Sequence, residues 1–242
     1  MRAAVGRPLL GDTGRIRAGL TVAACVIVVA ALGLLFNGEA GPDRLDNAVD
    51  SPVIAYFGAR AGVLPWLALP GTLIPAAVVS AVIVIACLIA GRFAAAFLAV
   101  AAVPAATGLS DGLLKHVFHR TYLGQIAFPS GHTTSAAALT ATLAVLFLIP
   151  PQQARTRAAR VTFVIVACVI TAGVAVGVIG LRWHYFTDCV AGAALGTGTV
   201  LTLALLIDLA PAVVSRARKP PAGRTPLPQA AGPPATANKP TA

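Results

Sequence analysis

The chain has 242 residues, of which 57% are hydrophobic and 11% are charged, and its mean hydropathy of +0.85 is typical of an integral membrane protein. The net charge of +10 would suit nucleic acid, but the Lys and Arg residues lie mostly in the tails and in short connections, which disfavours a nucleic-acid partner. The four cysteines lie within apolar runs without CxxC spacing, which argues against disulfides and a zinc site.

Six apolar stretches are candidates for transmembrane helices, since a span needs about 20 mostly apolar residues. They are residues 18–36, 71–90, 93–109, 132–149, 161–180 and 186–209. The first stretch follows a basic segment, as in a signal peptide, but it is longer than a usual signal core and no small-residue cleavage site follows it. We therefore interpret it as a retained anchor. The sequence predicts an all-α integral membrane bundle of six helices.

The distribution of Lys and Arg predicts the orientation of this bundle. With six spans, both termini lie on one side of the membrane, and thirteen Lys and Arg residues lie on that side against five on the other. The positive-inside rule then places both termini in the cytoplasm. We expect a plasma (inner) membrane protein with a cytoplasmic tail at residues 1–17, a membrane domain at 18–209, and a disordered, basic, Pro-rich cytoplasmic tail at 210–242.

The longest connection on the predicted extracytoplasmic side covers residues 37–62 and carries four of the eight acidic residues of the chain. Four of its apolar residues are spaced to share one face of a helix lying on the membrane. These are Leu45, Val49, Ile54 and Phe57. Prolines interrupt the chain around residues 63–70, which are predicted to form a separate interfacial turn before the second span.

Two polar islands contain all four histidines, and both lie on the predicted extracytoplasmic side. The first runs from Lys115 through Arg120 and ends in Pro-Ser-Gly-His at residues 129–132, where the fourth span begins. Ser130 is a good N-cap, and Gly131 allows close approach of a ligand to the backbone. The unpaired amides of such a helix start favour an anion with phosphate geometry, to which Lys115 and Arg120 can add positive charge.

The second island contains Arg182, His184 and Asp188. His184 and Asp188 are four residues apart, so they share a face if the segment is helical. A carboxylate on one ring nitrogen would fix the tautomer and leave the other nitrogen free to attack phosphorus. His132 would then protonate the departing oxygen. These residues predict metal-free phosphoryl transfer, without a cofactor.

Together the islands, at residues 115–188, resemble the three signature motifs of the type 2 phosphatidic acid phosphatase superfamily, whose wider clan includes the vanadium haloperoxidases. The family pattern is Lys-x6-Arg-Pro, Pro-Ser-Gly-His and Ser-Arg-x5-His-x3-Asp. The resemblance implies a haloperoxidase-like helical core and a phosphohistidine intermediate on His184. Site residues that match the motifs directly are Lys115, Ser130, Gly131, His132, His184 and Asp188.

Two of the three motifs depart from the family pattern. Seven residues after Lys115 the chain has Tyr122 followed by Leu123 instead of Arg-Pro, and before His184 it has Gly177 and Val178 instead of Ser-Arg. The nearest arginines are Arg120 and Arg182. We hypothesise that these two residues supply the phosphate contacts from shifted positions.

The expected function is hydrolysis of a lipid phosphate or diphosphate at the extracytoplasmic face. Undecaprenyl or decaprenyl diphosphate is the leading substrate; phosphatidic acid, phosphatidylglycerol phosphate and a polyprenyl-phosphosugar are alternatives. A transporter or channel should show ionisable residues near mid-membrane, and these spans are almost free of charge. A non-catalytic lipid-phosphate-binding protein is the main rival. The sequence leaves the oligomeric state open, and His116 and His119 are interpreted as bystanders of the first island.

Overall fold

The computed structural model describes residues 8–148 and 157–217. This part of the chain is a helical bundle with one short antiparallel strand pair, which confirms the predicted all-α class. The elements in chain order are α1 (Gly11–Leu35), α2 (Arg44–Phe57), η1 (Gly58–Val63), α3 (Leu64–Ala68), η2 (Leu69–Gly71), α4 (Leu73–Ile89), α5 (Phe93–Leu109), η3 (Ser110–Leu114), α6 (Lys115–Val117), β1 (Thr121–Tyr122), β2 (Gln125–Ile126), α7 (Gly131–Leu148), α8 (Arg157–Gly180) and α9 (Phe186–Ala217).

Each of the six predicted spans coincides with a helix, namely α1, α4, α5, α7, α8 and α9. By length and composition, five helical stretches of the described residues can cross a membrane. They are Gly11–Leu35, Arg44–Gly71, Phe93–Val117, Ala158–Gly180 and Phe186–Ala210. Helix α4 is equally apolar but has 17 residues, and α7 is largely buried inside the bundle. The number of spans is therefore close to six.

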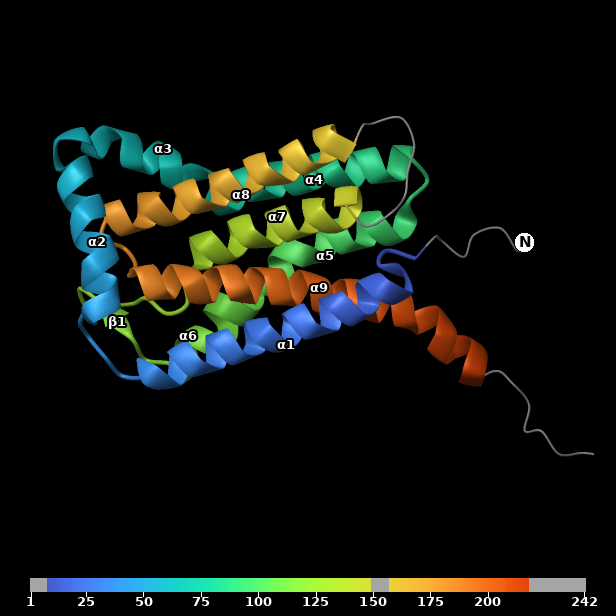
Figure 1. Ribbon diagram of the computed structural model, residues 1–242, viewed down its shortest axis with the longest axis horizontal. Coiled ribbons are helices and arrows are strands. Elements are labelled where there is room, and N and C mark those ends of the chain that lie inside the picture. Colours follow the sequence, from blue (N-terminus) through green and yellow to red (C-terminus); the bar gives the residue numbers. More distant parts are fainter. Residues whose placement is uncertain (1–7, 149–156, 218–242) are drawn as a thin grey trace, which may run out of the picture.

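The stretch Arg44–Gly71 is bent. It comprises α2, η1, α3 and η2, and the backbone of Arg60 leaves the helical region with φ −123° and ψ 26°. In Figure 1, α2 lies across one end of the bundle, whereas α3 runs beside α8. The helix predicted within residues 37–62 is present, while the segment predicted as an interfacial turn is α3 and η2.

The buried face of α2 is polar, and none of the four apolar residues predicted to share the membrane-facing side is buried. Asp46 and Asp50 are the buried residues of this helix, and Leu45 is 51% exposed. The two carboxylates are buried because each accepts a hydrogen bond from a backbone amide at the start of α9, as described below.

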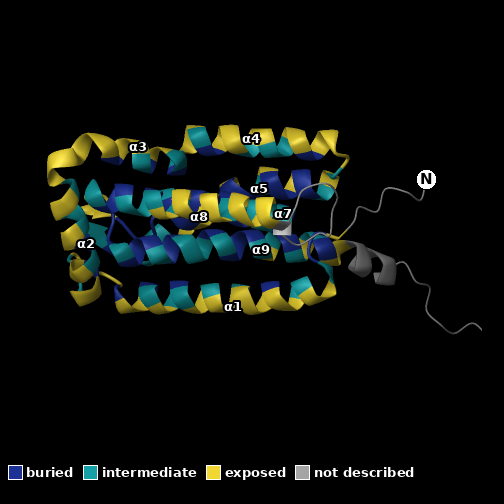
Figure 2. Cartoon of the chain, turned by 45° about the horizontal axis from the view of Figure 1, so that its top comes forward, coloured by how far each residue is buried: buried dark blue, intermediate teal, exposed yellow. Residues whose placement is uncertain are grey.

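Helices α7 and α9 form the centre of the bundle, and α1, α4 and α8 carry much of the exposed apolar surface (Figure 2). Two glycines allow α7 and α9 to approach closely. A Cβ atom at Gly196 would lie 2.3 Å from the carbonyl oxygen of Thr134, and one at Gly192 would lie 2.5 Å from that of Ser130. Small residues spaced four apart bring membrane helices into such backbone contact. This packing places the first turns of α7 and α9 side by side, and both polar islands meet there.

At the opposite end of the bundle, Asp208 connects α9 to the start of α1. Its carboxylate accepts hydrogen bonds from the amides of Leu9 and Leu10 at 2.6 and 2.9 Å, and Arg15 lies 3.5 Å away. Helix α1 begins seven residues before the predicted span, and α9 continues to Ala217. The predicted disorder of the C-terminal tail concerns residues that lie mainly outside the described part of the chain.

Candidate active site

His184 lies at the end of the loop between α8 and α9, and its ring is buried. Its Nδ1 atom lies 2.8 Å from the carbonyl oxygen of Ala127 and 4.0 Å from Oδ2 of Asp188. Because a carbonyl oxygen only accepts hydrogen bonds, Nδ1 carries the proton and Nε2 keeps its lone pair. The carbonyl of Ala127, rather than the carboxylate that the sequence suggested, therefore fixes the tautomer.

The surroundings of His184 keep its ring neutral. Burial, together with the positive charge of Lys115 and the neighbouring His132, lowers the pKa of His184 to about 3. At neutral pH the imidazole is therefore unprotonated at Nε2 and available as a nucleophile. The ring centroid of His132 lies 6.3 Å from that of His184, so the two histidines face one space without touching.

The Pro-Ser-Gly-His segment begins α7 as predicted. The Ser130 hydroxyl accepts a hydrogen bond from the amide of Thr133 at 3.4 Å, as an N-cap does. Ser130 is fully buried, and its own amide donates to the carbonyl oxygen of Asp188 at 3.1 Å. Gly131 and His132 face the cavity described below. Ser130 thus ties the first turn of α7 to the second island, while the next two residues are accessible to a ligand.

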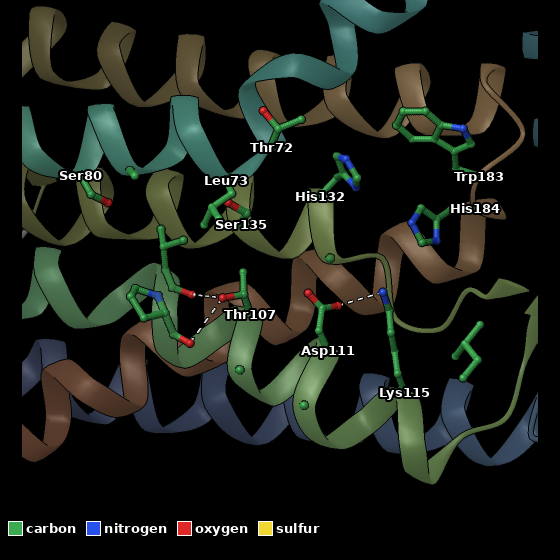
Figure 3. Close-up of a pocket in the computed structure, with 18 of the residues that line it drawn as sticks. Thr72, Leu73, Ser80, Thr107, Asp111, Lys115, His132, Ser135, Trp183 and His184 are labelled. Carbon is green, nitrogen blue, oxygen red and sulfur yellow. Dashed lines mark hydrogen bonds and ion pairs between the residues drawn. The ribbon is translucent and has the colours of Figure 1, made fainter.

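Lys115 faces the same space and forms an ion pair that the sequence analysis missed. Its Nζ atom lies 2.9 Å from Oδ1 of Asp111, one helical turn earlier. Asp111 also lies against the start of α7, where a Cβ on Gly131 would be 2.9 Å from the same carboxylate oxygen. Figure 3 shows Asp111, Lys115, His132 and His184 around one end of the cavity. The carboxylate of Asp111 therefore lies beside the predicted phosphate site.

These residues line a cavity of about 1400 Å³. Its polar end is formed by Lys115, Gly131, His132, Arg182 and His184, and its other end is lined mainly by apolar residues of α4 and α5. Several of these apolar residues have large exposed fractions, among them Leu73, Ile85 and Val100 at 74%, 56% and 55%. The cavity thus joins a basic, histidine-bearing end to an apolar end lined by α4 and α5.

The PAP2 superfamily model matches residues 113–210, which hold both polar islands and the helices α7 to α9. This part of the chain is therefore similar to the PAP2 superfamily. Among the curated proteins and the solved structures, none matches the chain. The superfamily is a helical membrane fold and generally comprises phosphatases, as the motif resemblance predicted.

Arg120 does not line the cavity. Its guanidinium is fully buried behind the site, where it donates to Oδ1 of Asp188 at 2.7 Å and to Oγ1 of Thr187 at 2.6 Å, and it also bonds the carboxylate of Asp46. The hypothesis that Arg120 contacts phosphate does not fit this placement. The guanidinium of Arg120 is bonded to the carboxylates of Asp46 and Asp188 and is therefore not available to a phosphate in the cavity.

Arg182 does line the cavity. It is exposed, and its backbone adopts φ +58°, a left-handed conformation that is uncommon for residues other than glycine. Tyr122, which occupies the position of a family arginine, lines the same cavity, and burial raises the pKa of its phenol, so the hydroxyl remains a hydrogen-bond donor. Both residues also line a second, smaller cavity of about 360 Å³.

The other missing arginine of the motif pattern has no counterpart in the candidate site. Val178, which occupies its position, is fully buried and packs with Ala68 of α3, Ile179 and Cys189. Helix α3 thus covers the region with apolar side chains. Within residues 8–148 and 157–217, no group of three His, Cys, Asp or Glu side chains is placed to hold a metal ion. His116 and His119 are exposed and do not line the cavity.

Three groups of the site were not predicted from the sequence, namely two carboxylates and one backbone carbonyl. Asp111 had a detectable signal, because Asp and Lys four residues apart on a helix commonly pair. Asp46 had no such signal among the residues near it in the sequence, since its partner Arg120 is 74 residues away. The carbonyl of Ala127 is a backbone group and carries no residue-type signature at all.

Proposed function

We propose that the protein is a metal-independent phosphatase of a lipid phosphate or diphosphate, which acts at the extracytoplasmic face of the plasma membrane through a phosphohistidine. The observation that carries the proposal is the free Nε2 of a neutral, buried His184, which faces the basic end of a cavity whose other end is apolar. A reactive nitrogen, cations for a phosphate and an apolar opening for a chain are the parts that such a reaction needs.

In the first chemical step, Nε2 of His184 attacks phosphorus, an N–P bond forms, and the bond between phosphorus and the leaving lipid oxygen breaks. His132 donates its proton to that oxygen. In the second step, His132 accepts a proton from water, the water oxygen attacks phosphorus, and the N–P bond breaks to give inorganic phosphate and free His184. Lys115 and the first amides of α7 stabilise the equatorial oxygens, with Arg182 and Tyr122 at the outer rim. The carbonyl of Ala127 orients the imidazole, and Asp188, paired with Arg120, holds the first turn of α9 beside it.

The apolar end of the cavity supports a lipid rather than a water-soluble phosphate ester as substrate. Exposed residues of α4 and α5 line it, so a hydrocarbon chain can enter sideways from the membrane while its phosphate stays at the basic end. A volume of about 1400 Å³ exceeds the 300–1,000 Å³ typical of pockets for small ligands. A polyprenyl diphosphate is our preferred substrate, with the other lipid phosphates named above as alternatives.

The test is phosphate release by the purified protein in detergent with EDTA, on a panel of polyprenyl phosphates, polyprenyl diphosphates, phosphatidic acid and phosphatidylglycerol phosphate. His184→Ala is expected to abolish release. The double variant His116→Ala/His119→Ala is the matched control, because these exposed histidines lie outside the cavity, and it is expected to keep wild-type turnover.

An acid-labile phosphoenzyme trapped by rapid quenching should appear in the wild type and be absent from His184→Ala. Lipid binding without turnover on every substrate would refute the enzyme and favour a lipid-phosphate-binding protein. Turnover that EDTA abolishes would refute the metal-independent mechanism.

A further inference from the structure

Helix α2 lies outside the segment matched to the PAP2 superfamily, yet it contacts the core of the candidate site. Its two buried carboxylates accept hydrogen bonds from the first amides of α9. Oδ1 of Asp50 lies 3.1 Å from the amide nitrogen of Phe186, and Oδ1 of Asp46 lies 2.9 Å from that of Thr187. These amides have no partner within α9, so α2 supplies the acceptors that the helix start needs.

Asp46 has a second connection to the site, through Arg120. The guanidinium bonds Asp46 on one side and donates to Asp188 on the other, and all three side chains are fully buried. The rings of Phe36 and Tyr185 lie 4.2 and 4.4 Å from the guanidinium carbon and confine it. The arginine is therefore fixed between one carboxylate of α2 and one of α9.

We propose that Asp46 is a positioning residue for the phosphoryl-transfer site, and that it acts on His184 and Asp188 through Arg120 and Thr187; this inference rests on the proposed phosphatase function. Asp46 bonds both the amide and the hydroxyl of Thr187, the residue next to Asp188. Since His184 lies just before α9, the placement of its imidazole depends on where the first turn of α9 is held.

The charges explain why a carboxylate is needed at this position. Without Asp46, the buried Arg120 keeps a single carboxylate partner, Asp188, and a buried cation that loses a partner draws the remaining one closer or admits water. Either change shifts the carboxylate of Asp188, which is bonded to Arg120 and also accepts a hydrogen bond from the amide of Tyr185 at 2.9 Å. Asp46 does not line the cavity, so its loss should slow the chemistry and leave substrate binding unchanged.

The experiment compares kcat and KM for phosphate release by the wild type, Asp46→Asn and Asp43→Asn. Asp43 is the matched control because it lies on the same helix end, undergoes the same change of charge and has no contact with Arg120; Asn also preserves its N-cap role. We expect kcat of Asp46→Asn to fall at least about tenfold with KM within about twofold, and Asp43→Asn to match the wild type. Turnover is counted per folded protein, measured by size-exclusion chromatography.

A double-mutant cycle tests the route through Arg120. Adding Asp46→Asn to Arg120→Gln should lower kcat by much less than it does in the wild-type background. Arg120→Lys serves if Asp46→Asn does not fold, because a lysine cannot bridge both carboxylates, and the same loss confined to kcat is expected. Wild-type kcat in folded Asp46→Asn or Arg120→Lys would overturn the inference and leave the phosphatase intact, as would a change confined to KM. Absence of turnover in the wild type on every lipid would overturn the proposed function and this inference with it.

Discussion

Acidification should lower the free energy of unfolding because His184 is buried in its neutral form. The variant His184→Asn lacks this titrating group and should lose less stability at low pH. The folded chain lowers the pKa of His184 to about 3 by burial, whereas the unfolded chain binds a proton near pH 6.5. Between these values the unfolded state binds more protons, so stability is complete above about pH 6.5 and is lost progressively as the pH falls towards 3. At pH 5 the loss from this residue is about 2 kcal/mol, that is, about 1.5 pH units at 1.36 kcal/mol each.

In a protein of this size, 2 kcal/mol corresponds to a fall of roughly 4–8 °C in Tm. The assay is thermal unfolding in detergent, followed by intrinsic tryptophan fluorescence at pH 7 and pH 5. Asn is the matched substitution because its amide can still donate to the carbonyl oxygen of Ala127 but does not titrate. The wild type should lose several degrees more than His184→Asn between the two pH values. Equal losses in both proteins would refute the buried, neutral histidine.

Three further substitutions test other parts of the structure. Arg182→Ala should lower kcat/KM by roughly 10–100-fold, and Arg182→Lys by less, because a charge-assisted contact with a phosphate oxygen contributes roughly 1.5–3 kcal/mol; an undiminished value would contradict its role at the rim. Asp111→Asn should make inorganic phosphate inhibit about fivefold more strongly, since removing a partly exposed carboxylate beside the anion site is worth roughly 1 kcal/mol; unchanged or weaker inhibition would argue against a phosphate site there. Gly196→Leu should prevent folding because its side chain would meet the backbone of α7, whereas Gly19→Ala, with open space around it, should fold normally in the same size-exclusion assay.

The helices and the local features of the site were predictable because they depend on neighbours in the sequence. Hydropathy alone marks a stretch of about 20 apolar residues, and each predicted span coincides with a helix of the bundle. The cap at Ser130 was predictable for the same reason, since the hydroxyl and the amide that it accepts from are three residues apart. The histidines His132 and His184 were recognised by the residues around them, and the structure brings them together.

Features that depend on distant partners could not be predicted from one sequence. The role of Arg120 was misjudged because its partners Asp46 and Asp188 are 74 and 68 residues away. The inward face of α2 could not be predicted for a related reason. The apolar residues of this helix indicate a side in contact with the membrane, but the partners of its two buried carboxylates, the first amides of α9, lie 136 and 141 residues away in the sequence.

The apolar end of the cavity, which α4 and α5 line, has a consequence for the kinetics of a lipid substrate. A substrate that enters from the membrane arrives by diffusion in two dimensions, so the rate follows its mole fraction among lipids and detergent instead of its concentration in the buffer. Adding detergent at constant substrate should therefore slow the reaction by dilution of the surface alone, and apparent KM values measured at different detergent concentrations should converge when expressed as mole fractions.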